Sequence, residues 1–137
     1  MPKSTATLGD ILAKVFKATA LPWDSATQFD LHLHTADPGV GGISTTSEAT
    51  YTNYALVTVN RSGAAWTTTG GPPATAKNAA IIQFPQCGAS GNTITHVSIT
   101  PNASTQILYY GALNASLAVA NLIQPQFAIN ALVITES

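Results

Sequence analysis

The segment with the residues best suited to chemistry is Asp30-Leu-His-Leu-His34. Its polar and apolar residues alternate strictly, so on an extended strand Asp30, His32 and His34 project from the same face. Two imidazoles and a carboxylate are transition-metal ligands, and a His-x-His pair on a strand begins the metal site of cupin-type jelly rolls. The segment therefore has the ligand types of a metal centre.

The remaining ligands of such a centre are missing from the expected positions. A cupin-type site adds a Glu shortly after the His pair and a further His downstream. Here Glu48 lies 14 residues beyond His34, behind a Gly-, Ser- and Thr-rich loop, and His96 is the only other histidine. We therefore predict that Asp30, His32 and His34 bind no metal. We interpret their face as the outward side of a half-buried strand, or as a protein contact.

Patterns typical of other catalytic sites are weak. No serine lies in a Gly-x-Ser-x-Gly elbow, and the six acidic residues are scattered along the chain. Cys87, in Phe-Pro-Gln-Cys-Gly, has no charged neighbour and is predicted to be a small buried apolar residue. The sequence thus predicts no catalytic, cofactor-binding or metal-binding residues, and a protein that is not an enzyme.

Aromatic residues are the other candidates for recognition. They could line a surface for a carbohydrate or a protein partner, because their rings combine apolar area with a polar edge. They could equally fill the core and its rim. The residues concerned are Trp23, Tyr51, Tyr54, Trp66, Tyr109 and Tyr110.

The whole chain is poor in charge. Only 8% of its 137 residues are charged, whereas it has 19 Thr and 10 Ser; an average protein has about 25% charged residues. Such a surface has little electrostatic protection against association, so we predict that partners cover much of it, with a Thr-rich monomer as the alternative. The net charge of −1 leaves no basic surface for nucleic acid, and no apolar run approaches the ~20 residues of a membrane span.

Residues 1–20 are predicted to contain a short amphipathic helix. Apolar residues from Leu8 to Phe16 recur with helical spacing, Thr7 can cap the helix, and Lys14 and Lys17 fall in its last turn. The charges within this segment do not fit a signal peptide, so we expect a protein made without an export signal. A helix this short must dock its apolar stripe on the domain's own core or on a neighbour.

Residues 21–137 are predicted to form a jelly-roll-like antiparallel β-sandwich, in a single all-β domain. Eight or nine short apolar or alternating runs recur every 8–12 residues, separated by turn residues. The long loop Thr35–Thr50 is expected to supply contacts together with the N-terminal segment. The expected strands are Gln28–His34, Tyr51–Asn60, Ala65–Thr69, Ala79–Phe84, Thr93–Thr100, Ile107–Leu113, Ser116–Ala120, Gln126–Asn130 and Ala131–Thr135.

Several motifs, in order along the chain, resemble those of small virion proteins of tailed bacteriophages. They are Val15-Phe16 at the end of the helix, the Leu-His-Thr-Ala-Asp-Pro motif in Leu33–Gly39, Thr46–Tyr51 in the loop, Leu108–Leu113, and the apolar run Ala131–Thr135. Proteins of this group are described as capsid cement (decoration) or tail-fibre-like proteins. Each motif is only moderately specific, and their shared order carries the resemblance.

The resemblance implies a β-sandwich on the outside of a phage head that bridges neighbouring capsomers without catalytic residues. We therefore expect a capsid cement protein on the outer surface of the virion, bound to the major capsid protein and to itself as a homodimer or homotrimer. One alternative is a tail-fibre or receptor-binding module that recognises a host glycan. Another is a small cupin-like metalloenzyme.

Overall fold

The structure is a computed structural model that describes residues 1–136. Within this range the chain forms one helix, α1 (Thr5–Lys17), followed by nine strands. The strands are β1 (Gln28–His34), β2 (Val57–Asn60), β3 (Trp66–Thr69), β4 (Ala74–Asn78), β5 (Ile82–Gln83), β6 (Asn92–Pro101), β7 (Tyr109–Val119), β8 (Gln126–Phe127) and β9 (Val133–Glu136).

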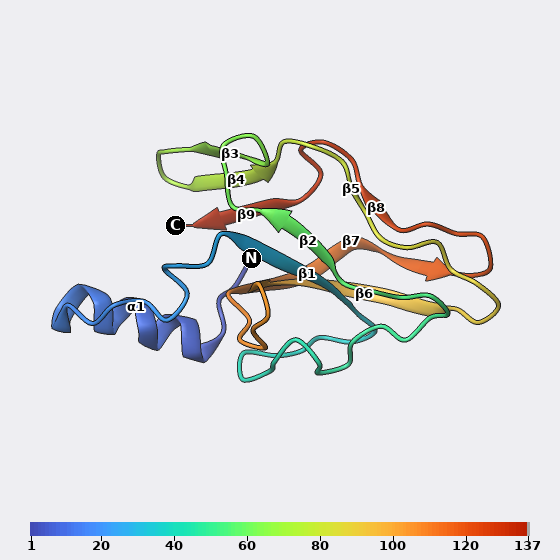
Figure 1. Cartoon of the computed structure of the whole chain (residues 1–137), viewed down its shortest axis with the longest axis horizontal. Helices are drawn as coiled ribbons and strands as arrows, with labels where there is room; N and C mark the ends of the chain where they lie inside the picture. The colour runs from blue at the N-terminus through green and yellow to red at the C-terminus, as the bar shows by residue number, and fades with distance from the viewer. Residues whose placement is uncertain (137) are drawn as a thin grey trace.

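The strands form antiparallel sheets stacked as a sandwich (Figure 1). The largest sheet has the order β2-β1-β6-β7. A sheet of order β3-β4-β9 and the pair β5-β8 lie on one side of it. This arrangement confirms the predicted all-β, antiparallel sandwich with an N-terminal helix.

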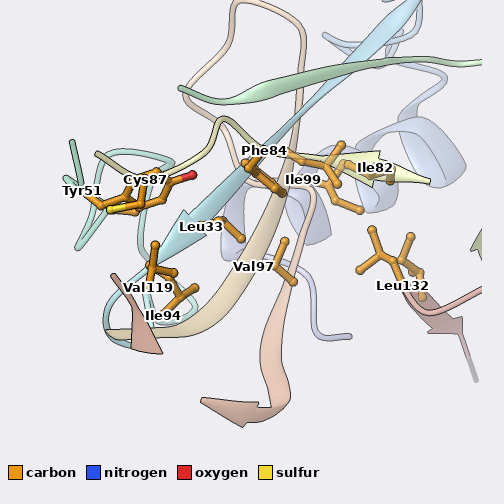
Figure 2. Packing of buried hydrophobic residues seen from close by; sticks show 13 residues of the cluster. Leu33, Tyr51, Ile82, Phe84, Cys87, Ile94, Val97, Ile99, Val119 and Leu132 are labelled. Carbon is orange, nitrogen blue, oxygen red and sulfur yellow. The ribbon is translucent and has the colours of Figure 1, made fainter. Parts of the chain in front are cut away.

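The core lies between these layers because β1 and β6 alternate in the way the sequence predicts. Leu31 and Leu33 of β1, with Ile94, Val97 and Ile99 of β6, are at most 2% exposed. Figure 2 shows several of them meeting side chains from the opposite layer. Those partners include Ile82, Phe84, Leu132 and Cys87. Cys87 is 2% exposed, so its predicted role as a small buried residue is confirmed.

The opposite face of the four-stranded sheet is covered over β1. Residues 35–56 fold back along the end of β1 and lie across this face (Figure 1). The N–H of Ala49 donates to the Leu33 carbonyl at 2.8 Å, and the N–H of Thr35 donates to the Ser47 carbonyl at 2.8 Å. The central strand β1 is therefore buried on both faces.

Helix α1 is fixed to the sandwich at its N-terminal end. Its N-cap is Ser4, whose side chain accepts from the N–H of Thr7 at 3.3 Å; the predicted cap, Thr7, lies inside the helix. The Ser4 and Thr7 hydroxyls both donate to the carbonyl of Ile107, at 2.5 and 2.8 Å. The helix ends at Lys17, its C-cap Ala18 adopts the left-handed region, and the helix projects from one end of the molecule (Figure 1).

Strand β7 is a free edge of the four-stranded sheet over most of its length. The N–H of Tyr110 donates to the carbonyl of Pro2, so the N-terminal residues cover the beginning of this edge. Farther along, the register with β6 breaks. Ile94 pairs with Leu117 and His96 pairs with Ala112, so four residues of β7, numbered 113–116, oppose Thr95 alone.

Several predicted strand boundaries are wrong. Only Val57–Asn60 of the predicted strand Tyr51–Asn60 is extended, because Tyr51–Tyr54 is a turn in which the N–H of Tyr54 donates to the Tyr51 carbonyl at 2.9 Å. Ile107–Leu113 and Ser116–Ala120 are replaced by the single bulged strand β7. The sequence analysis also missed β4, whose small and polar residues Ala-Thr-Ala-Lys-Asn alternate weakly.

Candidate functional site

The strand face that carries Asp30, His32 and His34 is buried, not outward as predicted. These side chains belong to residues that are 3%, 4% and 0% exposed. The sequence analysis placed Glu48 behind a Gly-, Ser- and Thr-rich loop that follows His34. In the structure that loop is pinned to the sheet edge, and Glu48 forms an antiparallel bridge with His34.

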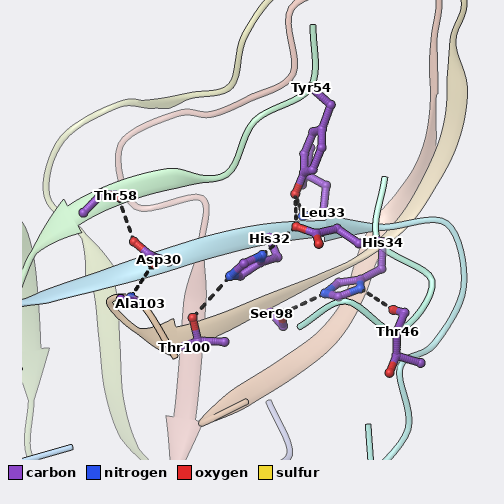
Figure 3. A network of polar contacts seen from close by, with 11 residues as sticks. Asp30, His32, Leu33, His34, Thr46, Tyr54, Thr58, Ser98, Thr100 and Ala103 are labelled. Atoms are coloured by element: carbon purple, nitrogen blue, oxygen red, sulfur yellow. Dashed lines mark hydrogen bonds and ion pairs between the residues drawn. The ribbon is translucent and has the colours of Figure 1, made fainter. Parts of the chain in front are cut away.

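His32 joins the loop to the sheet. Its Nδ1 atom lies 2.6 Å from a Glu48 carboxylate oxygen, and its Nε2 atom lies 3.2 Å from the Thr100 hydroxyl. An ionised carboxylate only accepts hydrogen bonds, so Nδ1 carries the hydrogen. The hydroxyl of Tyr54 donates to the same carboxylate at 2.9 Å, and the N–H of Leu33 donates to that hydroxyl at 3.1 Å (Figure 3).

His34 lies deeper and is held by two neutral partners. Its Nδ1–H donates to the Thr46 carbonyl at 2.8 Å, and its Nε2 accepts from the Ser98 hydroxyl at 2.7 Å (Figure 3). Burial lowers the pKa of His34 and outweighs the Thr46 carbonyl, which raises it. The imidazole therefore stays neutral at pH 7.

Asp30 is the third residue, with His32 and His34, of the buried polar layer on this face of β1. Its carboxylate accepts from the Thr58 hydroxyl at 2.7 Å, the Asn102 amide at 2.9 Å and the Ala103 N–H at 3.0 Å. Burial raises the pKa of Asp30, but these three donors outweigh it, so the net shift is downward. The ionised carboxylate fixes the turn that follows β6 and ties it to β1 and β2.

This layer is built to hold the fold together. The Ser98–His34 contact has the atoms of a nucleophile and its base, but both residues are 0% exposed, so no substrate reaches them. Within residues 1–136, no three His, Cys, Asp or Glu side chains are grouped as ligands for a metal ion. Each of Asp30, His32 and His34 instead has hydrogen-bond partners from the surrounding strands and loops.

The partners of His32 were missed at the sequence level. Glu48 and Tyr54 lie 16 and 22 positions after His32, and only the fold-back of the loop brings all three together. The sequence did hold one signal. Glu48, one of only six acidic residues, and Tyr54 both follow the His-x-His strand within one loop. That pattern does not distinguish a hydrogen-bonded clasp from an unrelated surface group.

The predicted aromatic candidates are distributed between the core and its rim. Tyr51 and Tyr110 are buried, and the other four residues are half-buried. The rings of Tyr51 and Tyr54 make an edge contact with centroids 5.2 Å apart, and burial raises the pKa of Tyr51 to about 12. The indole N–H of Trp66 donates to the Asn60 carbonyl at 3.1 Å. These rings serve packing inside the chain.

The outer face of α1 is the clearest candidate for a contact surface. Its apolar stripe, Leu8, Leu12, Val15 and Phe16, is 44%, 58%, 66% and 79% exposed. Sequence analysis left open whether this stripe covers the domain's own core or a neighbour. The chain itself leaves it uncovered, because Ser4 and Thr7 are the residues that dock the helix.

No helix in residues 1–136 has the length and apolar character needed to cross a membrane.

Comparisons with known proteins identify the family. No curated protein matches the chain. A family model described as "Podophage GP4 fiber I protein gp80" matches residues 2–135, which is nearly the whole chain. The match supports the predicted kinship with bacteriophage virion proteins. The chain therefore belongs to the Podophage GP4 fiber I protein gp80 family, a fibre-related family of bacteriophage structural proteins.

Proposed function

We propose that the chain is a non-enzymatic structural subunit of a podophage particle, located in a fibre and held there through α1. The observation that carries this proposal is the exposed apolar stripe on a helix that projects from a rigid sandwich. Isolated helices of 13 residues are marginal in water, so a stripe of this kind gains stability when a neighbour covers it. The family description, which names a fibre protein, supports the location.

The mechanism of attachment is repeated burial of uncharged surface. Thr, Ser and Ala side chains lose little hydration energy when a partner covers them, whereas charged side chains lose much more. Each contact can be weak, because many copies held in one assembly act together. The low charge content of the chain supports this mode of binding.

A second candidate is the capsid cement role, in which the same surface binds the major capsid protein on the outside of the head. The order of virion-protein motifs along the sequence favours it. Recognition of a host glycan is less well supported, because the Trp66 N–H and the Tyr54 and Tyr109 hydroxyls are already used within the chain.

Location on the particle tests the proposal. Gold-labelled antibodies against the purified chain should bind the fibres of intact particles. Labels spread over the head would favour the cement role, and particles that carry no copy would overturn both candidates.

The role of α1 is tested by substitution in place of deletion. Removing Met1–Lys17 would also remove the contacts of Lys3, Ser4 and Thr7 with the sandwich. The variant Phe16→Asp changes only an exposed position and should leave particles without the protein. Thr19→Asp, just beyond the helix, adds the same charge at an exposed position and should be incorporated normally. Normal incorporation of Phe16→Asp would contradict attachment through α1.

A further inference from the structure

A cavity of about 740 Å³ opens between the two main sheets. Its walls come from β1, β3, β4, β6, β7 and β9, and include Phe29, Trp66, Ile99, Leu108, Tyr109 and Ile134. The volume lies within the range of pockets that hold ligands. No residue of α1 contributes to the walls, so the chain's own helix does not fill this space.

The indole, phenol and guanidinium groups around the cavity are already bonded within the chain, and the hydroxyls of Ser62, Thr68, Thr69 and Thr75 complete its polar lining. The Trp66 indole donates to Asn60, and the Tyr109 hydroxyl donates to Glu136, which also accepts from Lys3 at 2.5 Å. The guanidinium of Arg61 is bonded to three backbone carbonyls of residues 23–26. Only hydroxyls are left to bond an occupant, whereas the apolar walls offer a larger area, so the cavity suits apolar side chains better than a sugar.

The α1 stripe has the matching chemistry. It presents Leu8, Leu12, Val15 and Phe16 on a helix whose N-terminal end is fixed to the Ile107 carbonyl. The same chain thus carries an apolar helix stripe and an apolar cavity, and the stripe does not fill the cavity of its own chain.

We infer that the cavity receives the apolar stripe of α1 from a second copy of the chain. This inference rests on the proposed function in one respect, the use of α1 for assembly, and it names the partner and the acceptor site. In a head-to-tail arrangement this contact is heterologous and continues from copy to copy in a ring or a row. That geometry is suited to a repeating fibre.

Buried area favours a concave acceptor over a flat one. A stable interface buries about 800 Å² on each partner, more than four side chains of one helix supply on a flat surface. A concave acceptor covers more of each inserted side chain than a flat surface does. In a heterologous assembly each copy also takes part twice, once with its helix and once with its cavity, so the buried area per copy doubles.

Two variants block the two halves of the contact separately. Phe16→Asp places a charge in the stripe, with Thr19→Asp as its control. Thr68→Arg places a charge in the cavity, because Thr68 lines it on the same side of β3 as Trp66. Thr67→Arg is the matched control, since Thr67 is exposed on the opposite face of the same strand. All four changed positions are exposed, and circular dichroism and urea unfolding verify that each variant is folded.

Sedimentation of each protein, alone and in mixtures, tests the inference. The wild type and both controls should self-associate at micromolar concentration. Phe16→Asp and Thr68→Arg should each be monomeric, with association weakened at least about 30-fold. An equimolar mixture of the two should form a one-to-one pair that grows no further, because one intact cavity meets one intact helix.

Three sedimentation results, and one incorporation result, would overturn the inference. The sedimentation results are a monomeric wild type, self-association of Thr68→Arg equal to that of its control, and a mixture that stays monomeric. If helix paired with helix, for example, Thr68→Arg would still associate with itself. The mixture would then contain no complex of Thr68→Arg with Phe16→Asp. If Phe16→Asp alone is absent from particles while Thr68→Arg is incorporated, the helix binds another virion protein. The proposed function would then stand and this inference would fail.

Discussion

The Nδ1 atom of His32 lies 2.6 Å from a carboxylate oxygen of Glu48, a residue 16 positions later in the chain. This contact links the central strand β1 to the loop that covers it. Tyr54 donates to the same carboxylate, so Glu48 accepts hydrogen bonds from His32 of β1 and from Tyr54 of the loop. The clasp they form fixes the fold-back of residues 35–56.

Substitution Glu48→Gln should destabilise the folded protein by about 1–3 kcal/mol, because hydrogen bonds to a charged acceptor become bonds to a neutral amide. Urea unfolding at pH 7 measures the change. The control Asp24→Asn alters an exposed carboxylate and should stay within about 0.5 kcal/mol of the wild type. Equal stability of the two variants would show that the clasp contributes nothing.

Stability should fall as the pH is lowered from 7 to 5. The pKa of His34 is lower in the folded state than its unfolded value near 6.5. The unfolded chain therefore binds the proton more readily. The stabilisation from neutral His34 is complete above pH 6.5 and declines below it until the lower folded-state pKa is reached. Denaturant melts at several pH values give this slope.

Variants separate His34 from the other titrating groups. His34→Gln should flatten the decline between pH 7 and 5, whereas His96→Gln should keep it. Asp30 and Glu136 have lowered pKa values, so their stabilisation is present above their unfolded pKa and is lost only at more acidic pH. An unchanged slope in His34→Gln would assign the decline to another group.

Asn78 is predicted to be among the most sensitive polar positions. It is 0% exposed, its amide donates to the Ala80 and Ala128 carbonyls at 2.8 Å, and its oxygen accepts from the Leu132 N–H at 2.9 Å. Asn78→Ala leaves these groups without partners and should cost about 2–4 kcal/mol in unfolding free energy. The exposed Asn114→Ala should cost little, and a similar cost for both would contradict this role.

The untagged protein should contain no stoichiometric transition metal. Asp30, His32 and His34 direct their polar atoms to three different sets of partners, so they do not converge on one ion. Elemental analysis of protein purified without chelator checks this, and the melting temperature should not change when EDTA is added. A one-to-one content of Zn, Mn or Fe would restore the metalloenzyme hypothesis.

Local pattern was enough to predict the elements whose residues alternate clearly. Strand Gln28–His34 has the predicted bounds. Four of the five residues predicted for the apolar stripe of the helix, Leu8, Leu12, Val15 and Phe16, are exposed, and Ile11 is half-buried. Strand β4 could not be predicted, because its side chains are small and its pairing with Val133–Glu136 joins segments more than 50 residues apart. Pairing over such distances depends on the whole fold and leaves only a weak local signal.

The candidate site was harder to predict for the same reason. The sequence places Asp30, His32 and His34 on one strand face, as observed, but does not reveal what covers that face. Burial of a polar face requires partners for every group, and those partners come from Glu48, Tyr54 and from strand β6 after a long excursion of the chain. A polar strand face that points to solvent and a buried polar face with hydrogen-bond partners for every group therefore have the same sequence pattern.

Strand β7 carries no charged residue between Tyr109 and Val119. Beyond the first residues, where Pro2 and Lys3 pair with it, no strand within residues 1–136 pairs with its outer edge. An unpaired edge can template further strands. A straight, uncharged edge of this length is the starting point of cross-β polymers. Residues 113–116 oppose Thr95 alone, and the three extra residues interrupt the row. The bulge therefore works against amyloid-like growth at the edge of a protein with very little electrostatic repulsion.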